Sequence, residues 1–439
     1  MKKCVCKLMV LAVIVLAVCG KGFADVKINE ANFPDEKFRS YVSSIFDTNR
    51  DGSLSSAEIA NATRIDVSNS SISSLKGVEY FTALTELSCY YSQLTALDVS
   101  NNTALTRLVC YENQLTALDV SNNTALTYLA CDSNQLTALD VSKNTALTSL
   151  YCSDNQLTAL DVSQNTALTG LVCYKNQLTA LDVSNNTALT HLACNSNQLT
   201  ALDVSKNTAL TYLACDSNQL TAIDVSKNTA LTRLFCYSNQ LTSLDLSKNT
   251  ALTRLECFDN QLTALDVSKN TALLELYCHS HQLTALDLSK NTALTTLWCY
   301  TNQLTILDLS NNTNLANLRC DFTITSADNN FEFNIADFLK AYKSLDNNLR
   351  SIDFLYVYTG GRGSLTLAPD IIAASNIVSF TIPEGKNISY IYMVLTYSNS
   401  SDKHVYVYPS SGTSSATTDP RLVKRRTHHH NLITPLRLR

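Results

Sequence analysis

The strongest constraint on the fold is a stretch of 21 residues that recurs with small changes from about Leu84 to Leu318. Its register is easiest to follow on cysteine, because each copy carries one at the same position. Twelve cysteines follow one another at intervals of 21 residues: Cys89, Cys110, Cys131, Cys152, Cys173, Cys194, Cys215, Cys236, Cys257, Cys278, Cys299 and Cys320. One copy cannot bury its own leucines, so the copies must stack as coils that share a continuous core. The sequence therefore predicts an elongated solenoid.

Within each copy the leucines, the cysteine and an asparagine keep the spacing LxxLxCxxNxL. A fixed period of roughly 20–29 residues with this frame is typical of leucine-rich repeats, and it predicts an α/β solenoid that forms an arc rich in β structure. The segment Leu-x-Cys is expected to be a strand that pairs in parallel with its neighbours. In the copy around Cys110, Leu108 and the cysteine then point inward, whereas Arg107, Val109 and Tyr111 point outward.

Two columns of side chains are expected along the stack, one of cysteine and one of asparagine. The asparagines three residues after the cysteines, such as Asn113, should form a hydrogen-bonded ladder that Ser92 and His281 interrupt. We interpret the cysteines as small buried thiols, because parallel-stacked side chains do not meet the dihedral angle of a disulfide. The chain has no CxxC pair, so a zinc site is not expected.

The second half of each repeat, LTALDVSxNTA, hardly varies and is expected to form the back of the coil. It places one aspartate in each coil: Asp98, Asp119, Asp140, Asp161, Asp182, Asp203, Asp224, Asp245, Asp266, Asp287 and Asp308. We expect each carboxylate to accept hydrogen bonds from the backbone of the turn that follows, and a run of cation sites is the alternative. Lysines recur beside this column, at Lys143, Lys206, Lys227, Lys248, Lys269 and Lys290.

Residues 1–24 have the pattern of a secretory signal peptide. Three lysines within the first seven residues precede an apolar run too short to span a membrane, and small residues end the segment at Ala24. A lipoprotein-type cleavage before Cys19 is the alternative. Both readings predict a secreted or cell-surface protein of a bacterial envelope, with no transmembrane segment in the mature chain.

Residues 25–63 are expected to form a small helical cap. A helix should begin near Phe33, with Pro34 in its first turn and acidic residues near its positive end. Apolar side chains then recur at helical spacing, at Phe38, Tyr41, Val42, Ile45 and Phe46.

The next twelve residues match the calcium loop of an EF-hand. The expected ligands are Asp47, Asn49, Asp51, Ser53, Ser55 and Glu58, and Gly52 allows the sharp turn between them. The sequence therefore predicts one structural Ca²⁺. The alternative is an acidic turn that serves only as a helix cap.

The flanks of the repeats differ from the repeats themselves. Residues 64–83 resemble an irregular first repeat, so the repeat region spans 64–320, as expected where a terminal coil meets a cap. Residues 321–408 predict a small β-rich C-terminal domain, and residues 409–439 predict a disordered basic tail.

The copies differ mainly at the outward positions of the strands, which should share the concave face. The ligand-binding residues predicted on this face are Tyr111, Tyr128, Tyr151, Tyr174, Tyr212, Arg233, Phe235, Tyr237, Arg254, Phe258, Tyr277, Trp298 and Tyr300. Tyrosine, tryptophan and arginine are enriched at binding hot spots. The alternative is drift at positions where packing imposes no constraint, since tyrosine also favours strands.

The repeat LTxLxCxxNQLTALDVSxNTA, with cysteine in every coil, resembles the cysteine-ladder repeats of bacterial internalins of the internalin J kind. The EF-hand-like cap before the repeats resembles that family as well. The resemblance implies a surface adhesin or scaffold that binds a protein ligand on its concave face, and a carbohydrate ligand is the alternative. The sequence has no LPxTG motif, so we carry over neither wall anchoring nor host invasion.

Several functions are not expected from the sequence. The chain shows no GxSxG, HExxH or Gly-rich phosphate loop, so it is not expected to be an enzyme. The net charge of −5 gives no indication of a nucleic-acid partner. We expect a monomer.

Overall fold

The computed structural model describes residues 25–304, most of 307–322 and, by their backbone, the strands within 324–409; side chains are described as far as Cys320. The predicted signal peptide and residues 410–439 of the predicted tail lie outside the described residues.

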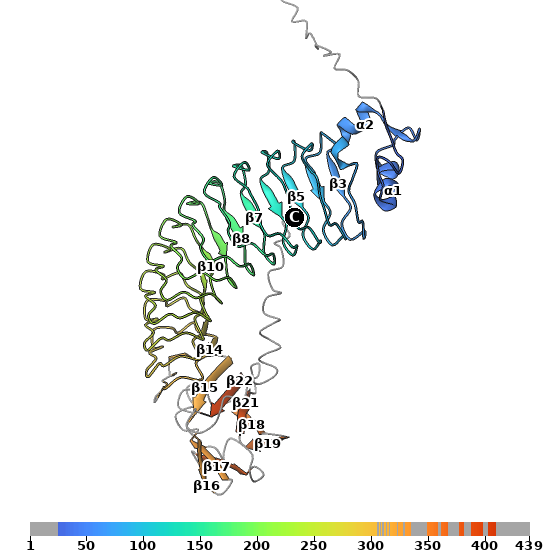
Figure 1. Cartoon of the computed structure of the whole chain (residues 1–439). Coiled ribbons are helices and arrows are strands. Elements are labelled where there is room, and N and C mark those ends of the chain that lie inside the picture. The colour runs from blue at the N-terminus through green and yellow to red at the C-terminus, as the bar shows by residue number, and fades with distance from the viewer. Residues whose placement is uncertain are drawn as a thin grey trace, which may run out of the picture.

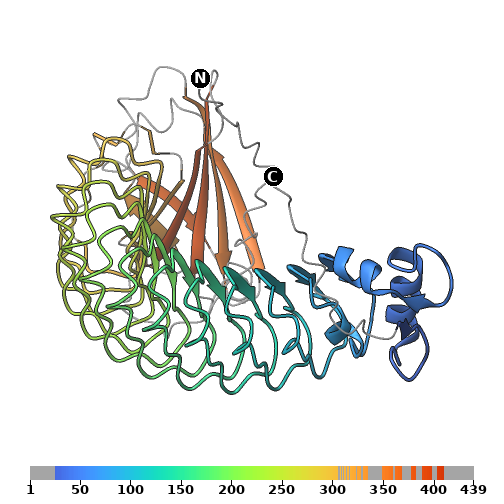
Figure 2. The ribbon, with the colours of Figure 1, turned by 90° about the horizontal axis from the view of Figure 1, so that it is seen from above.

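The repeats form an arc of stacked coils, each of which contributes one short strand to a parallel sheet (Figure 1). The strands are β3 (Arg64–Asp66), β4 (Glu86–Ser88), β5 (Arg107–Val109), β6 (Tyr128–Ala130), β7 (Ser149–Tyr151), β8 (Gly170–Val172), β9 (His191–Ala193), β10 (Tyr212–Ala214), β11 (Arg233–Phe235), β12 (Arg254–Glu256), β13 (Glu275–Tyr277), β14 (Thr296–Trp298) and β15 (Asn317–Phe322). From β4 onward the register places each residue beside the one 21 positions later, as Leu108 lies beside Leu129. Figure 2 shows these strands along the inner curve.

The core is a continuous stack of leucine and cysteine side chains, which confirms the predicted alternation. Leu108 and Cys110 are 0% exposed, and the twelve repeat cysteines are all buried at the same register. They are thiols and form no disulfide. Burial raises the pKa of the Cys173 thiol to about 12, so this side chain stays protonated and behaves as a small apolar group.

The predicted asparagine ladder is present at the strand ends. The Asn176 side-chain amide donates to the carbonyls of Cys152 at 3.0 Å and Cys173 at 3.1 Å. Its oxygen accepts from the Leu157 amide of the preceding coil at 3.0 Å. One side chain thus joins two coils and satisfies buried backbone groups that no strand pairing reaches.

A second asparagine ladder, which we did not predict, runs along the opposite turn of each coil. The Asn165 side-chain amide donates to the carbonyls of Val141 at 3.0 Å and Asn144 at 2.9 Å. Its equivalents in the other coils are almost fully buried and make the same pair of bonds. This explains why the NTA segment hardly varies between copies.

The column of aspartates on the back of the coils caps turns, as expected. Asp161 accepts a hydrogen bond from the Ser163 backbone amide at 2.8 Å, and this bond holds the pKa of the carboxyl below its ordinary value. The same bond recurs from coil to coil. In the described coils these backs are turns and extended segments, without strands.

The N-terminal cap contains two short helices and a small ribbon. The elements are α1 (Glu36–Ile45), α2 (Ser56–Asn61) and the antiparallel pair β1 (Val26–Lys27) and β2 (Ser53–Leu54), and the 3₁₀ helix η1 (Val78–Tyr80) follows in the first coil. Asp35 caps α1 by accepting from the amides of Lys37 and Phe38 at 3.0 Å. Pro34 therefore precedes the helix, and the prediction that it lies in the first turn is wrong.

The cap docks on the first coil through aromatic packing and one carboxylate. Phe33 is fully buried against Phe81, with ring centroids 6.5 Å apart. The second oxygen of Asp35 accepts from the Ser73 amide at 2.8 Å. Of the apolar positions predicted for α1, Ile45 lies on the solvent side and is 54% exposed.

Beyond the repeats the sheet continues into longer strands. β22 (Lys403–Pro409) pairs in parallel with β15, and β21 (Ile388–Tyr397), β18 (Leu349–Tyr358) and β19 (Gly361–Leu367) follow it in antiparallel order. β16 (Ile324–Ala327), β17 (Asn330–Asn334) and β20 (Ile377–Thr381) form a separate sheet. That this region is an independent domain stays a prediction.

Candidate ligand-binding face

Three rows of side chains cover the concave face of the parallel sheet. The first row lies three residues before each cysteine, the second row one residue before it and the third row one residue after it. Because the register is constant, each row runs along the inner curve of the arc, one residue per coil. Side chains 21 positions apart in the sequence are therefore neighbours on this face.

The predicted ligand-binding residues all lie in these rows. The first row holds Tyr128, Tyr212, Arg233 and Arg254; the second holds Tyr151, Phe235, Tyr277 and Trp298; and the third holds Tyr111, Tyr174, Tyr237, Phe258 and Tyr300. Most are partly exposed and Arg233 is exposed, but Tyr300 is only 8% exposed and offers little surface to a ligand.

A small hydrophobic cluster lies on this face, separate from the core of the coils. We call it the central patch: Val172, Ala193 and Ala214 of the second row, with Tyr151, Tyr174, Tyr212 and Phe235 packed against them. The three small residues are at most 4% exposed. Sequence reasoning missed their role, because small side chains looked like drift. Their signal is positional: three consecutive coils carry small second-row residues between the larger Tyr151 and Phe235.

Towards the C-terminal coils the third row becomes a stack of rings. Tyr237, Phe258, His279 and Tyr300 follow one another with centroids 4.3, 4.3 and 4.4 Å apart and nearly parallel planes. Coil spacing in a parallel sheet, about 4.8 Å, brings such rings into stacking contact. Within the stack each ring covers the face of its neighbour.

An ion-pair network lies beside this stack. Arg254 donates to one oxygen of Glu256 at 2.8 and 2.6 Å and pairs with Glu275 at 2.8 Å. Its guanidinium lies 5.6 Å from the Phe235 ring centroid and 5.3 Å from that of Tyr277. The predicted ligand-binding residue Arg254 is therefore held by its own neighbours, and a ligand must compete with them.

Two carboxyl groups of the third row are withdrawn from solvent, Asp216 almost fully and Asp132 partly, and neither was among the predicted site residues. Asp216 is 2% exposed. Burial raises the pKa of Asp216 to about 7, although a hydrogen bond from the Tyr237 hydroxyl opposes the shift. Burial also raises the pKa of Asp132 to about 7, against a hydrogen bond from the Ser153 amide at 3.0 Å. Carboxyls perturbed in this way are concentrated at functional sites.

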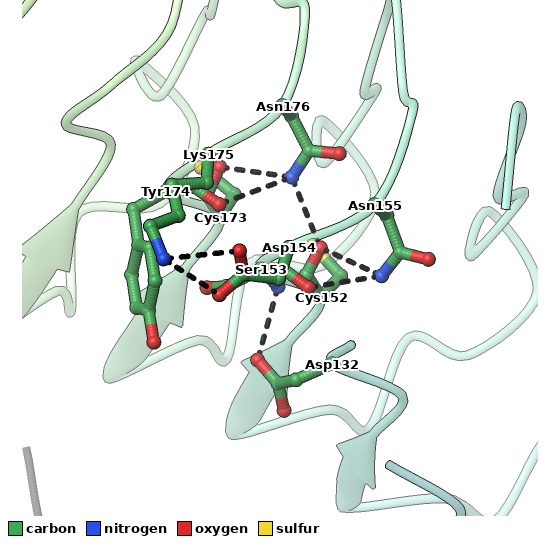
Figure 3. Close-up of polar contacts among 9 residues, drawn as sticks. All are labelled: Asp132, Cys152, Ser153, Asp154, Asn155, Cys173, Tyr174, Lys175 and Asn176. Atoms are coloured by element: carbon green, nitrogen blue, oxygen red, sulfur yellow. Dashed lines mark hydrogen bonds and ion pairs between the residues drawn. The ribbon is translucent and has the colours of Figure 1, made fainter. Parts of the chain in front are cut away.

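Figure 3 shows the surroundings of Asp132. The Ser153 amide points down to its carboxylate, while Asp154 of the same coil pairs instead with Lys175 of the next coil at 3.2 Å. Asn155 and Asn176 hold the turns above through carbonyls of the strand ends (Figure 3). The asparagine ladder therefore fixes the backbone that positions the Asp132 and Asp154 carboxylates.

The predicted calcium loop is closed by hydrogen bonds between its own residues. Glu58 accepts from the Thr48 amide and hydroxyl at 2.7 Å with one oxygen, and from the Ser55 amide and hydroxyl at 2.8 Å with the other. These bonds lower the pKa of Glu58 to about 2. Asp47 accepts from the amides of Asp51 and Gly52 at 3.1 and 3.0 Å.

As folded here, the loop does not present a converged set of metal ligands. Within the described residues, no three Asp, Glu, His or Cys side chains lie close enough together to hold a metal ion. Both Glu58 oxygens already accept hydrogen bonds, so calcium would compete with the helix cap. Calcium binding by this loop therefore stays a prediction.

The comparisons with known proteins agree with the coil geometry. No protein-family model matches the chain. The chain is 45% identical over 70 residues to internalin J of Listeria monocytogenes serotype 4b (strain F2365), a match that covers 16% of this chain and 8% of that protein. Among the described residues, no helix is long and apolar enough to cross a lipid bilayer.

Two solved internalin structures from Listeria monocytogenes are similar over most of the chain. The functional domain of InlJ, whose description includes a cysteine ladder, is 32% identical with a TM-score of 0.56, covering 89% of this chain and 99% of that domain. The internalin inlF is 26% identical with a TM-score of 0.63, covering 73% and 96%. With its buried cysteine column and parallel coil sheet, the chain belongs to the internalin-like leucine-rich repeat proteins.

Proposed function

We propose that the protein is a secreted or cell-surface adhesin or scaffold that recognises a protein ligand on the concave face of its arc. The observation that supports this most strongly is the central patch. Its rings pack on small residues of the sheet, so they are ordered before any ligand arrives. Aromatic side chains fixed in this way lose little conformational entropy on binding, which favours affinity.

Each repeat has a nearly constant part and a variable part, and this contrast supports the same conclusion. The turns carry two asparagine ladders and an aspartate column and hardly differ between coils, whereas the three rows of the sheet differ in nearly every coil. Stacking of the coils on one another requires only the nearly constant residues of the turns. Similarity to internalins supports a location at the surface or outside the cell.

The proposal is tested by affinity capture from extracellular or surface protein extracts. The variant Y151A/Y212A/F235A removes three of the four rings of the central patch, and K206A/K227A/K248A changes the same number of residues on the back of the coils. We expect the first variant to lose the protein captured by the wild type and the second to retain it. Equal capture by the wild type and both variants would contradict concave-face binding.

A carbohydrate ligand is the second candidate, because partly exposed aromatic rings and carboxylates share this face. Sugars stack on aromatic faces and donate hydroxyl hydrogen bonds to carboxylates. In the stacked third row, however, neighbouring rings cover one another's faces. A glycan array probed with the wild type and Y151A/Y212A/F235A decides between the two: a glycan signal lost in the variant would favour carbohydrate.

A further inference from the structure

Asp216 is a buried carboxyl and Asp132 a partly buried one, and the described part of the chain supplies neither with an ion-pair partner. Among the described residues, the ion pairs involve neither of them, although Asp154 and Lys175 pair nearby. Removing a carboxylate from water without a cationic partner costs several kcal/mol by the usual estimates. Other coils carry a serine or an asparagine at this position, Ser153 and Asn195, so the fold does not require a carboxylate there.

Asp132 lies one coil before Tyr151, the first residue of the central patch, and Asp216 lies in the coil of Tyr212, one coil before Phe235. The two carboxyls share the third row and are separated by 84 positions, which is four coils, with Tyr174 of the patch between them. Asp132 interacts electrostatically with Tyr151 and Tyr174, and Asp216 with Tyr212. At about 4.8 Å per coil, the two carboxyls are about 19 Å apart along the face.

We propose that the ligand contacts this face with an extended peptide segment that carries two cationic side chains six residues apart, with apolar side chains between them. One cation pairs with Asp132 and the other with Asp216, while the apolar residues cover the patch rings. Six residues of an extended chain span about 20 Å and place both cations on the same side of the segment. This inference rests on the proposed function of the concave face.

Along the third row the charges favour a cation over an anion, while the first row carries the exposed Arg233 in the coil of Phe235. In the third row and the position that follows it, the central coils carry Asp132, Asp154 and Asp216 against the single cation Lys175, which Asp154 neutralises. At the neighbouring coils Glu112 and Asp259 add to the same side. An anionic segment would meet repulsion along this row, whereas a dicationic one removes an electrostatic cost already present in the unbound protein.

Asp216 exchanges one partner when the cation arrives. It accepts a hydrogen bond from the Tyr237 hydroxyl, which the incoming ammonium replaces, and the nearby Glu256 stays paired with Arg254. Asp132 is partly exposed and accepts from the Ser153 amide.

The titratable groups facing Asp132 are Asp154, Tyr111, Tyr128, Tyr151, Tyr174 and the neighbouring ladder thiols. Those facing Asp216 are Tyr212, Tyr237, Glu256 and the ladder thiols beside it.

Calorimetry with synthetic peptides tests the inference on the full chain. The probe has two lysines six positions apart, with alternating leucine and serine between them; matched peptides carry glutamate in place of lysine, or two adjacent lysines. We expect the probe to bind at least about tenfold more tightly than either matched peptide. Binding at pH 7 should also release protons, seen as a dependence of the heat on the ionisation enthalpy of the buffer.

Variants separate this site from general attraction to an acidic protein. D132N and D216N should each weaken the probe about tenfold and reduce proton release, whereas D224N, which removes one charge from the back of a coil, should leave both within twofold. Equal effects of D216N and D224N, or equal affinity for the lysine and glutamate peptides, would overturn the inference. If a captured protein ligand still depends on Tyr151, Tyr212 and Phe235 in that case, the proposed function stands and only the dicationic motif fails.

Discussion

At Gly77 the backbone φ is 105°, and a Cβ added there would overlap the Phe33 ring and the Asn32 carbonyl. Gly52 also has a positive φ, of 80°, but a Cβ there meets nothing within 4 Å. Both alanine variants incur the left-handed backbone cost of roughly 1 kcal/mol, and G77A adds an overpacking cost of about 1–3 kcal/mol.

We therefore expect G77A to lower the free energy of unfolding of the cap clearly more than G52A, which serves as its matched control. Urea denaturation followed by hydrogen exchange of the α1 amides measures the difference. Equal destabilisation by the two variants would mean that the Phe33 ring moves aside freely.

The calcium prediction belongs to the same scale, because it depends on how Glu58 uses its two oxygens. For the predicted Ca²⁺ to bind Glu58, it must replace the donors Thr48 and Ser55 at these oxygens. We expect isothermal titration to show uptake of Ca²⁺ by the wild type, loss of uptake in D47A, and a calcium-dependent rise in the melting temperature of the wild type only. Absence of uptake by the wild type would leave the loop as a hydrogen-bonded helix cap.

The Asp132 and Asp216 carboxyls also predict how stability depends on pH. Burial raises the pKa of Asp132 and Asp216 to about 7 in the folded chain, whereas an unfolded aspartate titrates near 3.9. Between these pH values the folded chain binds more protons, so its stability falls as the pH rises from about 4 to about 7. D132N and D216N remove this loss. D216N should gain up to about 4 kcal/mol over the wild type at about pH 8 and little at about pH 3, and D132N, at a partly exposed carboxyl, should gain less.

The matched control is D224N on the back of a coil, where the Ser226 amide lowers the pKa of the carboxyl. For such a group the stabilisation is present above the unfolded pKa and is lost as the pH falls through the folded pKa. D224N should therefore lose stability at neutral pH, the opposite sign. Urea midpoints across the pH range measure both effects, and a D216N curve parallel to that of the wild type would contradict the buried charge.

At the scale of the repeat element, the asparagine ladder sets how strongly coils adhere to one another. In an intact rung, one asparagine donates to two or three carbonyls and accepts from a leucine amide, as Asn176 does. At His281 the rung has an imidazole, which has no carbonyl oxygen for the Leu262 amide. The buried ring is also harder to charge, because burial lowers the pKa of His281.

H281N restores the rung, and we expect it to stabilise the chain by about 1–2 kcal/mol, since each recovered buried hydrogen bond contributes about 1 kcal/mol. N176A should destabilise by about 2–4 kcal/mol, because it leaves several buried backbone groups without partners. Guanidinium denaturation of both variants beside the wild type measures the pair. If H281N were neutral, the imidazole would already satisfy the carbonyls that the amide reaches in other coils.

The single repeat also shows how much of the structure could be predicted from the sequence. Leu108, Cys110 and Asn113 were placed correctly because a feature repeated at a constant period must occupy the same site in each coil. The second ladder, through Asn165, was missed because an invariant NTA segment shows that a constraint exists without showing which atoms impose it. The start of α1 was placed one turn too early, because Pro34 suits either side of the cap that Asp35 occupies.

Across the whole molecule, every 21 residues of sequence add one coil to the arc. The spatial separation of two positions along the arc therefore grows with their separation in the sequence at a fixed rate. The sequence was enough to place thirteen candidate side chains on one face, because that step needs only strand alternation. It was not enough to find the central patch or the carboxyls of Asp132 and Asp216. Those depend on which large side chain lies over which small one, and that is decided between coils.

This fixed rate gives a test that no point mutation provides. Deleting residues 189–209 removes one coil between Asp132 and Asp216, whereas deleting 252–272 removes one coil outside that interval. Both deletions join an alanine to a leucine in the original register, so both chains should fold, because a solenoid is stabilised mainly by contacts between neighbouring coils. Only the first changes the separation of the two carboxyls, from about 19 Å to about 14 Å.

The chain lacking 189–209 should therefore prefer a peptide with lysines four positions apart, which spans about 14 Å, over the six-position probe. The chain lacking 252–272 should keep the preference of the wild type. Calorimetric titration of each chain with the two peptides measures the shift, and circular dichroism checks that both chains fold. A preference unchanged by the inner deletion would show that the ligand does not span the two carboxyls, because the distance between them is what that deletion alters.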